Sequence, residues 1–500
     1  MLFPTTVFAV FFFLVFHGHW ALAGHPRARK AFLLAASLFF YGFWSWKFAL
    51  MLLGSALVNH AAARRMDGLD RAGAPEASRR RLLAGIVALN LGLLGFFKYT
   101  GFLFADVLFP LLRPVCAAIG SDAVWTLVRA QEEIYPWISR IVLPVGISFF
   151  TFQALSYVVD VYRRRTPPAR SWLDFANYLA FFPQLVAGPI VRAANLVPQM
   201  EQMPERGQPL EAPRAMILIL GGLFKKTVVA NWLASRLADP VFAWPEIYSG
   251  PDILLAVYAY AVQIYCDFSA YSDIAIGTAL LLGFRFPANF NAPYAAATLQ
   301  EFWRRWHISL SSWLRDYLYI PLGGSRRGEG RTYVNLLVTF LLGGLWHGAA
   351  WTFLLWGAFH GLYLALERLV LGWLGRVVRP SGGAFRPLAV WLGRIWIFHV
   401  VCFSWILFRG GNLETAGALL RGLAAWRGAV PDVTLWGGTA VAMVVIGLTT
   451  QLWDGDRLWT GARWIVSRPA WALGAAGALV CTVILALGPE GVAPFIYFQF

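Results

Sequence analysis

The chain has 500 residues, of which 58% are hydrophobic and only 14% are charged. Soluble domains carry about 25% charged residues, so the composition excludes a soluble protein and predicts an integral membrane protein. The net charge of +16 does not indicate nucleic-acid binding, because the basic residues lie in short stretches between apolar runs rather than on one soluble face.

Ten apolar runs follow one another along the chain. They cover residues 7–23, 31–63, 82–97, 141–159, 216–237, 253–282, 333–370, 388–408, 435–452 and 470–487. A span needs about 20 residues and several runs are long enough to fold back, so we expect roughly ten to twelve helices. The runs are continuous rather than alternating, which favours helices over a membrane barrel. The prediction is an all-α, polytopic membrane bundle that forms a single domain over residues 1–500.

Basic residues mark one side of the predicted bundle. They gather at residues 26–30, 64–81 and 163–165, between the apolar runs. Because short basic loops of membrane proteins remain in the cytoplasm, we expect these loops to face that side. We also expect residues 7–23 to be a retained helix, since they lack the basic start of a signal peptide.

Polar residues interrupt the apolar runs in the middle of the chain. They occur in three segments, residues 144–153, 182–189 and 265–273. A charged group at the centre of a membrane helix costs about 2.5 to 3.5 kcal/mol, so such groups normally face the bundle interior or a cavity. The three segments are therefore predicted to wall one internal chamber.

Two carboxylates of the third segment, Asp267 and Asp273, have two possible roles. They could form a proton or cation relay, as in a transporter, or they could pair with nearby bases. Pairing is the more frequent outcome for carboxylates inside a membrane and is favoured here. The candidate bases are Lys225, Lys226, Arg304 and Arg305.

The segment at residues 301–320 is too charged to span a membrane. At helical spacing one face holds Trp303, His307, Leu310 and Leu314, and another holds Arg304, Ser311 and Arg315. We expect one helix that lies at the interface or re-enters the bundle. His307 could belong to an interfacial belt of Trp and Arg residues, for which those residue types are expected.

His347 stands among glycines, in Gly343-Gly344-Leu345-Trp346-His347-Gly348. The glycines could mark a break between two spans or a site of close helix packing. An imidazole in an apolar stretch is costly unless it is paired or functional, and it exchanges protons near neutral pH. Spacing alone leaves open whether His347 is structural or chemical. His360 is predicted to be part of a packed aromatic cluster.

The sequence lacks the motifs of several other enzyme classes. It contains no H-E-x-x-H zinc signature, no P-loop, no G-x-G-x-x-G after a strand and no G-x-S-x-G elbow. Its four cysteines have no metal-ligand spacing, so no metal site is predicted. An enzyme of this sequence would need an acid–base histidine without a serine triad.

Four segments together resemble the membrane-bound O-acyltransferase (MBOAT) family. They are residues 143–153, 267–273, 302–324 and 344–348, and the block Phe302-Trp-Arg-Arg-Trp-His307 is the most specific. The chain is most similar to the bacterial polysaccharide O-acetylation branch, to which the alginate acetylation membrane protein belongs. The closing residues 495–500 also resemble that branch.

The resemblance implies a bundle around a funnel, with a catalytic core at about residues 140–370. It implies that His347 is catalytic and that His307 is a second histidine at the chamber, although many members outside this branch carry Asn there. A histidine with an ordinary pKa of about 6.5 can take the proton of an acceptor hydroxyl near neutral pH. The residues expected to bind substrate are Arg304, Arg305, Ser311, Arg315, Asp316, Trp346, Asp267 and Gln153.

The resemblance also implies a reaction and its setting. No cofactor is expected to be bound, and acetyl-CoA is the expected cytoplasmic donor. The expected location is the bacterial inner membrane, with a periplasmic acetyltransferase or a polysaccharide as acceptor and with no nucleic-acid partner. Three alternatives stay open: D-alanyl or other acyl transfer to a cell-wall polymer, a non-catalytic acyl-group transporter, and an assembly scaffold.

Overall fold

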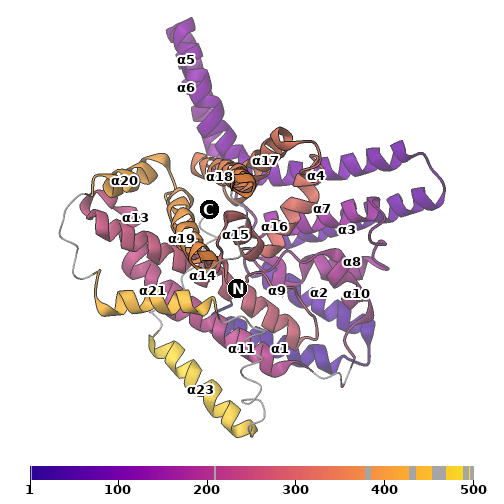
Figure 1. Cartoon of the computed structure of the whole chain (residues 1–500). Helices are drawn as coiled ribbons and strands as arrows, with labels where there is room; N and C mark the ends of the chain where they lie inside the picture. The colour runs from indigo at the N-terminus through magenta and orange to yellow at the C-terminus, as the bar shows by residue number, and fades with distance from the viewer. Residues whose placement is uncertain are drawn as a thin grey trace.

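A computed structural model describes the chain except for residues 2, 206, 208–209, 378–384, 427–434, 453–468, 488–494 and 496–500. Within the described residues the fold contains helices and no strand (Figure 1). This confirms the predicted all-α fold. Of the closing segment that resembles the acetylation branch, only Phe495 lies inside the described residues.

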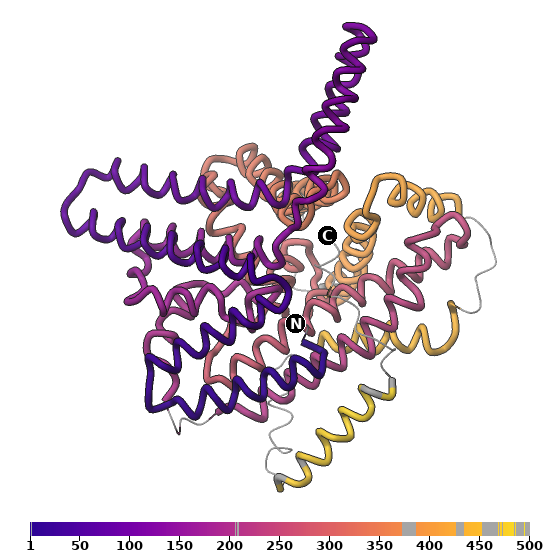
Figure 2. The backbone as a smooth tube through the Cα atoms, turned by 180° about the vertical axis from the view of Figure 1, so that it is seen from behind, coloured from indigo at the N-terminus to yellow at the C-terminus, as the bar shows by residue number. Residues whose placement is uncertain are grey.

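The first part of the chain forms long helices. They are α1 (Thr6–Ala21), α2 (Pro26–Gly42), α3 (Trp46–Arg71), α4 (Glu76–Phe102), η1 (Leu103–Leu108), α5 (Phe109–Ile119) and α6 (Ser121–Ile138). Helices α3 and α4 run side by side as a long hairpin, and α5 and α6 form a second hairpin that projects from the rest of the molecule (Figures 1 and 2).

The middle of the chain combines short helices with one long central helix. The elements are α7 (Ile147–Tyr162), α8 (Trp172–Ala180), α9 (Phe182–Leu185), α10 (Ala193–Gln202), α11 (Ala212–Leu223), η2 (Phe224–Ala230), α12 (Asn231–Leu233), η3 (Ala234–Ala238), α13 (Asp239–Ala243), η4 (Pro245–Ile247), α14 (Gly250–Leu281) and η5 (Pro293–Ala295). Helix α14 begins with a capping box between Ser249 and Asp252. It is buried along almost its whole length and packs against α11, α19 and α21.

The last part of the chain carries the histidines predicted to be functional. Its elements are α15 (Leu299–Arg305), α16 (Ile308–Leu314), η6 (Arg315–Tyr319), α17 (Glu329–His347), α18 (Trp351–Val377), α19 (Phe385–Arg409), α20 (Leu413–Ala424), α21 (Gly438–Thr450) and α23 (Ala470–Leu487). The histidine predicted to lie in an aromatic cluster, His360, does so: its ring centroid is 5.1 Å from that of Trp303 and 4.7 Å from that of Trp356.

The number of spanning helices differs from the expected ten to twelve. Among the described residues, five helical segments are long and apolar enough to cross a membrane: Glu76–Ile119, Ala212–Ala243, Gly250–Leu281, Trp351–Gly372 and Pro387–Arg409. Apolar runs at 141–159 and 435–452 form helices of only 16 and 13 residues, which is shorter than the roughly 20 residues of a span. The protein is therefore a multi-pass membrane protein in which several apolar helices are too short to cross by themselves.

The single helix predicted over residues 301–320 is wrong. The backbone breaks between α15 and α16 at His307, which has a φ of 42° in the left-handed region. A non-glycine residue in that region cannot continue a right-handed helix. The break separates His307 from the face that it was predicted to share with Trp303, Leu310 and Leu314.

The glycines around His347 serve both purposes that the sequence left open. Helix α17 ends at His347 and α18 begins at Trp351, so a break lies between the two helices. The helices also pack with their backbones in contact: a Cβ atom on Gly344 would collide with the carbonyl of Phe353, and one on Gly357 with the carbonyl of Phe340. Small residues permit such close approach in membranes.

We expect Gly357→Ala to destabilise the protein, because the added methyl group would meet the α17 backbone. Overpacking of this kind typically costs about 1 to 3 kcal/mol. Thermal unfolding of the purified protein in detergent measures the effect. Gly372→Ala is the matched control on the same helix, since a Cβ atom at Gly372 has no neighbour within 4 Å. Equal melting temperatures for both variants would contradict the close packing of α17 and α18.

Candidate active site

His347 is the last residue of α17 and is buried, with 6% of its surface exposed. Its ring centroid lies 5.0 Å from that of Trp346, 5.2 Å from that of Trp356 and 5.1 Å from that of Phe408. The helix ends here because Gly348 takes an extended conformation. The aromatic rings therefore hold the imidazole in place from several sides.

Helix α4 fixes the end of α17. The Lys98 ammonium donates to the carbonyl oxygens of Trp346 and His347, the latter at 3.1 Å, and the Tyr99 hydroxyl donates to the carbonyl oxygen of Leu345 at 2.8 Å. The last carbonyls of a helix have no donor within the helix, and a cation is favourable at that end. Lys98 and Tyr99 thus satisfy three carbonyls and hold the backbone of His347.

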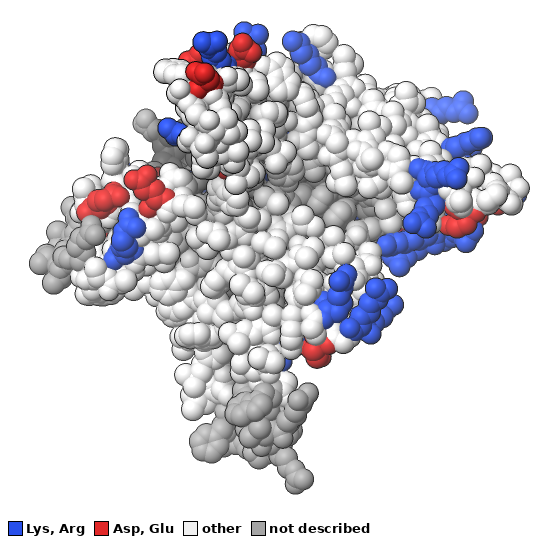
Figure 3. Space-filling view, turned by 90° about the horizontal axis from the view of Figure 1, so that it is seen from above, with Lys and Arg blue, Asp and Glu red and all other residues white. Residues whose placement is uncertain are grey.

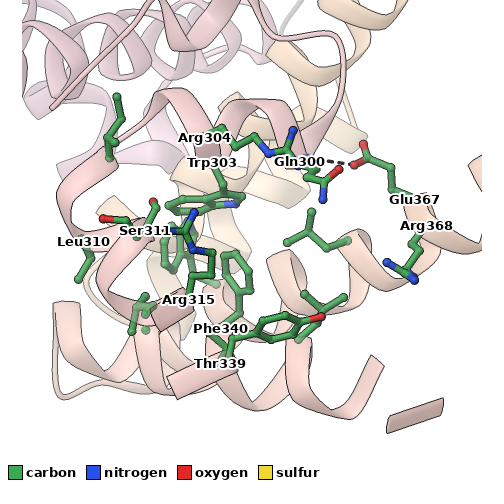
Figure 4. Close-up of a pocket in the computed structure, with 18 of the residues that line it drawn as sticks. Gln300, Trp303, Arg304, Leu310, Ser311, Arg315, Thr339, Phe340, Glu367 and Arg368 are labelled. Atoms are coloured by element: carbon green, nitrogen blue, oxygen red, sulfur yellow. Dashed lines mark hydrogen bonds between the residues drawn. The ribbon is translucent and has the colours of Figure 1, made fainter. Parts of the chain in front are cut away.

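A cavity of about 520 Å³, here called the basic-side cavity, reaches His347 from one side. Its wall includes Gln300, Trp303, Arg304, Leu310, Ser311, Arg315, Thr339, Phe340, Trp356, Glu367 and Arg368. Figure 4 shows the polar side chains around this cavity together with the apolar wall of Trp303, Leu310 and Phe340. The cavity combines guanidinium groups with an apolar interior that leads to an imidazole.

A second cavity of about 350 Å³, the distal cavity, reaches His347 from another side. Its wall comprises Trp44, Lys98, residues 143–149, Val186, Ala187, Trp346, His347 and Phe495. Two of the three polar segments predicted to wall one chamber line this cavity. The third segment does not, and its Tyr265, Ser269 and Asp273 line a smaller cavity of about 60 Å³.

The two large cavities extend from His347 toward segments that contact different ends of α7. Arg163, directly after α7, donates to the carbonyl oxygen of Asp316 at 3.3 Å, and Asp316 belongs to the η6 segment that lines the basic-side cavity. Gly146, directly before α7, lines the distal cavity. Since α7 has 16 residues, it is about 24 Å long. The basic-side cavity thus reaches the η6 segment, which contacts the residue after α7, whereas the distal cavity lies at the start of α7.

Basic residues mark the side of the molecule on which the basic-side cavity lies. Arg164, which follows α7, pairs with Asp70 near the end of α3 at 2.6 Å. The basic stretches at residues 64–81 and 163–165 therefore meet on one side. Figure 3 shows Lys and Arg gathered mainly on the side where the hairpin of α3 and α4 ends in Figure 1.

His307 is fully buried and lines neither large cavity. Its ring centroid is 6.2 Å from that of Trp346 and 4.5 Å from that of Phe268. Its Nδ1 atom is 3.2 Å from Oδ1 of Asn289, and its Nε2 atom has no hydrogen-bond partner among the described residues. The ring of Trp346 thus neighbours the rings of both His307 and His347.

The other predicted substrate-binding residues divide into two groups. Arg304, Ser311 and Arg315 line the basic-side cavity, and Trp346 lines the distal cavity. The remaining four line neither large cavity. Arg305 pairs with Glu301 at 2.6 Å, Asp316 pairs with Arg192 at 3.3 Å, Asp267 pairs with Lys226 at 2.6 Å, and Gln153 is buried with its side-chain amide unpartnered within the described chain.

The predicted pairing of the α14 carboxylates is confirmed. Asp273 binds Lys225 at 2.6 Å, in addition to the Asp267–Lys226 pair. Buried charges of opposite sign that are already paired do not suggest an ion relay. Sequence reasoning missed Lys98, whose signal was a lone lysine at the end of an apolar run, where an unpaired charge would be costly.

The chain matches the family model of the membrane-bound O-acyltransferase family over residues 127–408. It is 37% identical, over 100% of both chains, to a Pseudomonas putida protein named as a probable alginate O-acetylase. It is 35% identical to a Helicobacter pylori peptidoglycan O-acetyltransferase, over 86% of this chain and 80% of that one.

It is also 28% identical to a Streptococcus thermophilus teichoic acid D-alanyltransferase, over 53% of this chain and 68% of that one. The protein belongs to the membrane-bound O-acyltransferase family and is an O-acyltransferase. An imidazole that borders two cavities suits such a reaction, because it can accept a proton from a group in one cavity and return it to a group in the other.

We expect Lys98→Met to lower acyl transfer by about 10- to 100-fold, as happens when a group that orients a metal ligand is removed. The Met side chain is unbranched and only one atom shorter, but it leaves the carbonyls of Trp346 and His347 without their ammonium donor. Steady-state transfer rates of purified protein check this, and Lys47→Met, an exposed lysine of α3, is the control. An unchanged rate in Lys98→Met would show that α4 does not hold His347.

Proposed function

We propose that this protein transfers acetyl groups from a cytoplasmic thioester donor to hydroxyl groups on the other side of the bacterial inner membrane, for O-acetylation of an exported or envelope polysaccharide. The observation that carries the proposal is the position of His347, which lines both large cavities. A group that enters through one cavity can react at His347 with a group that enters through the other.

The chemistry needs one base at this junction. The imidazole of His347 takes the proton of the acceptor hydroxyl as its oxygen attacks the thioester carbonyl. The carbon–sulfur bond breaks as the carbon–oxygen bond forms, and the proton passes from the imidazolium to the leaving thiolate. Burial favours the neutral form of an imidazole, which is the form that acts as a base.

The basic-side cavity is the proposed donor site, with acetyl-CoA as donor. Arg304 and Arg315 lie on its wall, and guanidinium groups suit the phosphates of such a thioester. By the positive-inside rule, the side with the basic stretches faces the cytoplasm, where acyl thioesters are made. The apolar interior of the cavity would hold the acyl arm near His347.

The distal cavity is the proposed acceptor site. The similar proteins from Pseudomonas putida and Helicobacter pylori are named for acetyl transfer to alginate and to peptidoglycan, which favours a glycan hydroxyl or a periplasmic acetyltransferase as the acceptor. Transfer of a D-alanyl group is the second candidate, supported by the similarity to the teichoic acid enzyme over half of the chain. Offering both thioester donors to one preparation distinguishes the two reactions.

We expect His347→Ala to abolish acetyl transfer, because His347 is the one residue of the described chain that lines both large cavities. Labelled acetyl-CoA is supplied to one side of membrane vesicles, and labelled glycan and released CoA are measured. His347→Gln keeps most of the volume and should be equally inactive, whereas His17→Ala, at an exposed histidine of α1, should be as active as the wild type. Normal glycan acetylation by His347→Ala would refute the proposed function.

We expect the double variant Arg304→Gln and Arg315→Gln to raise KM for acetyl-CoA by about tenfold, which corresponds to about 1.4 kcal/mol. Because both arginines are exposed, added salt should raise KM in the wild type more than in the variant. Arg331→Gln, at an exposed arginine of α17 that does not line the cavity, is the control. Equal KM values for all proteins would place the donor elsewhere.

A further inference from the structure

Three potential donors meet at one oxygen atom behind His307. Oδ1 of Asn289 is 3.2 Å from Nδ1 of His307, 3.1 Å from the backbone nitrogen of Ser309 and 2.9 Å from the Ser309 hydroxyl. All three residues are buried, and Asn289 is only 1% exposed. A buried amide with this many contacts has little freedom to rotate.

The contact with Ser309 settles which end of the amide faces His307. A backbone N–H can only donate, so the atom of Asn289 that it meets must be the oxygen. An oxygen facing Nδ1 of His307 requires that Nδ1 carries the proton, because two acceptors would repel each other. In neutral histidine, Nε2 then holds the lone pair and is a hydrogen-bond acceptor.

Asn289 also supports the strained backbone at His307. Its carbonyl oxygen accepts from the backbone nitrogen of Ile308 at 2.9 Å, and its side chain accepts from that of Ser309. These are the first residues of α16, whose N–H groups lack partners within the helix. A non-glycine residue in the left-handed region is strained and persists only when its surroundings hold it.

Asn289 and Ser309 are themselves held by two other parts of the chain. Nδ2 of Asn289 donates to the Ser272 hydroxyl of α14 at 3.0 Å, and the Ser309 hydroxyl accepts from the backbone nitrogen of Ile190 at 3.0 Å. Ser272 lies in the polar segment of α14, which lines neither large cavity. The arrangement assigns that segment to the support of His307.

We propose that Asn289 is the positioning residue of His307: it keeps the proton on Nδ1, so that Nε2 is the unprotonated acceptor nitrogen of a ring that lies beside Phe149 and Trp346. Nε2 is buried and has no partner among the described residues, although leaving a buried polar atom unsatisfied is costly. The His307 ring neighbours Phe149 and Trp346, which both line the distal cavity. The expected effect on acetyl transfer rests on the proposed function.

Solid-state ¹⁵N NMR of histidine-labelled protein in lipid tests the tautomer directly, since protonated and unprotonated ring nitrogens have distinct shifts. A difference spectrum against His307→Gln assigns the signals. In the wild type we expect His307 with Nδ1 protonated and Nε2 unprotonated. In Asn289→Leu we expect a mixture of tautomers and a 10- to 100-fold loss of acetyl transfer.

Asn289→Asp keeps an oxygen that accepts from His307 and Ser309, so it should keep Nδ1 protonated and recover most of the activity that Asn289→Leu loses. Asn291→Leu is the matched control, because Asn291 is exposed and its side chain does not contact His307. The wild-type spectrum and Asn289→Asp keep the test valid if Asn289→Leu folds poorly.

A wild-type spectrum with Nε2 protonated overturns the proposal. So does an Asn289→Leu variant that transfers acetyl at the wild-type rate or keeps the wild-type His307 signals. Failure of the proposed function has a different signature, which is an active His347→Ala variant, and in that case the tautomer of His307 would still be as described.

Discussion

The carbonyl groups at the end of α17 impose the constraint on which the site depends. A helix that ends inside an apolar bundle leaves its last carbonyls without donors, and each unsatisfied buried group is costly. Lys98 and Tyr99 of α4 supply those donors. The backbone of His347 is therefore held by a helix more than 240 residues away in sequence, in addition to the aromatic rings that surround its side chain. Both large cavities border His347.

The two cavities differ as the two partners of an acyl transfer differ. One carries arginines at a rim next to the basic stretches of the chain, and the other is bounded by the aromatic and apolar residues at the start of α7. The histidines are not equivalent either. His347 borders both cavities, whereas His307 lies behind Trp346, with a polar network on its far side. Asymmetry of this kind suits a reaction with a defined direction.

Much of this site was predictable from residue types, and part of it was not. The cost of polar groups in a membrane singled out His347 and the pairing of Asp267, because that cost depends only on composition and depth. The break at His307 was not predicted, since the helical periodicity of the sequence continues through residues 301–320. The contacts that hold the break come from Asn289, which lies outside that segment. Arg305 was predicted to bind substrate with Arg304, but adjacent residues on a helix point in different directions, and only Arg304 faces the cavity.

The backbone contact between α17 and α18 has a consequence for how substrates gain access. Gly344 and Gly357 fit against the facing helix only in one register, so a shift by a helical turn would bring larger side chains into the same space. The helix that carries His347 therefore has no second resting position on α18. Any movement of His347 relative to the other helices therefore carries α18 along with α17.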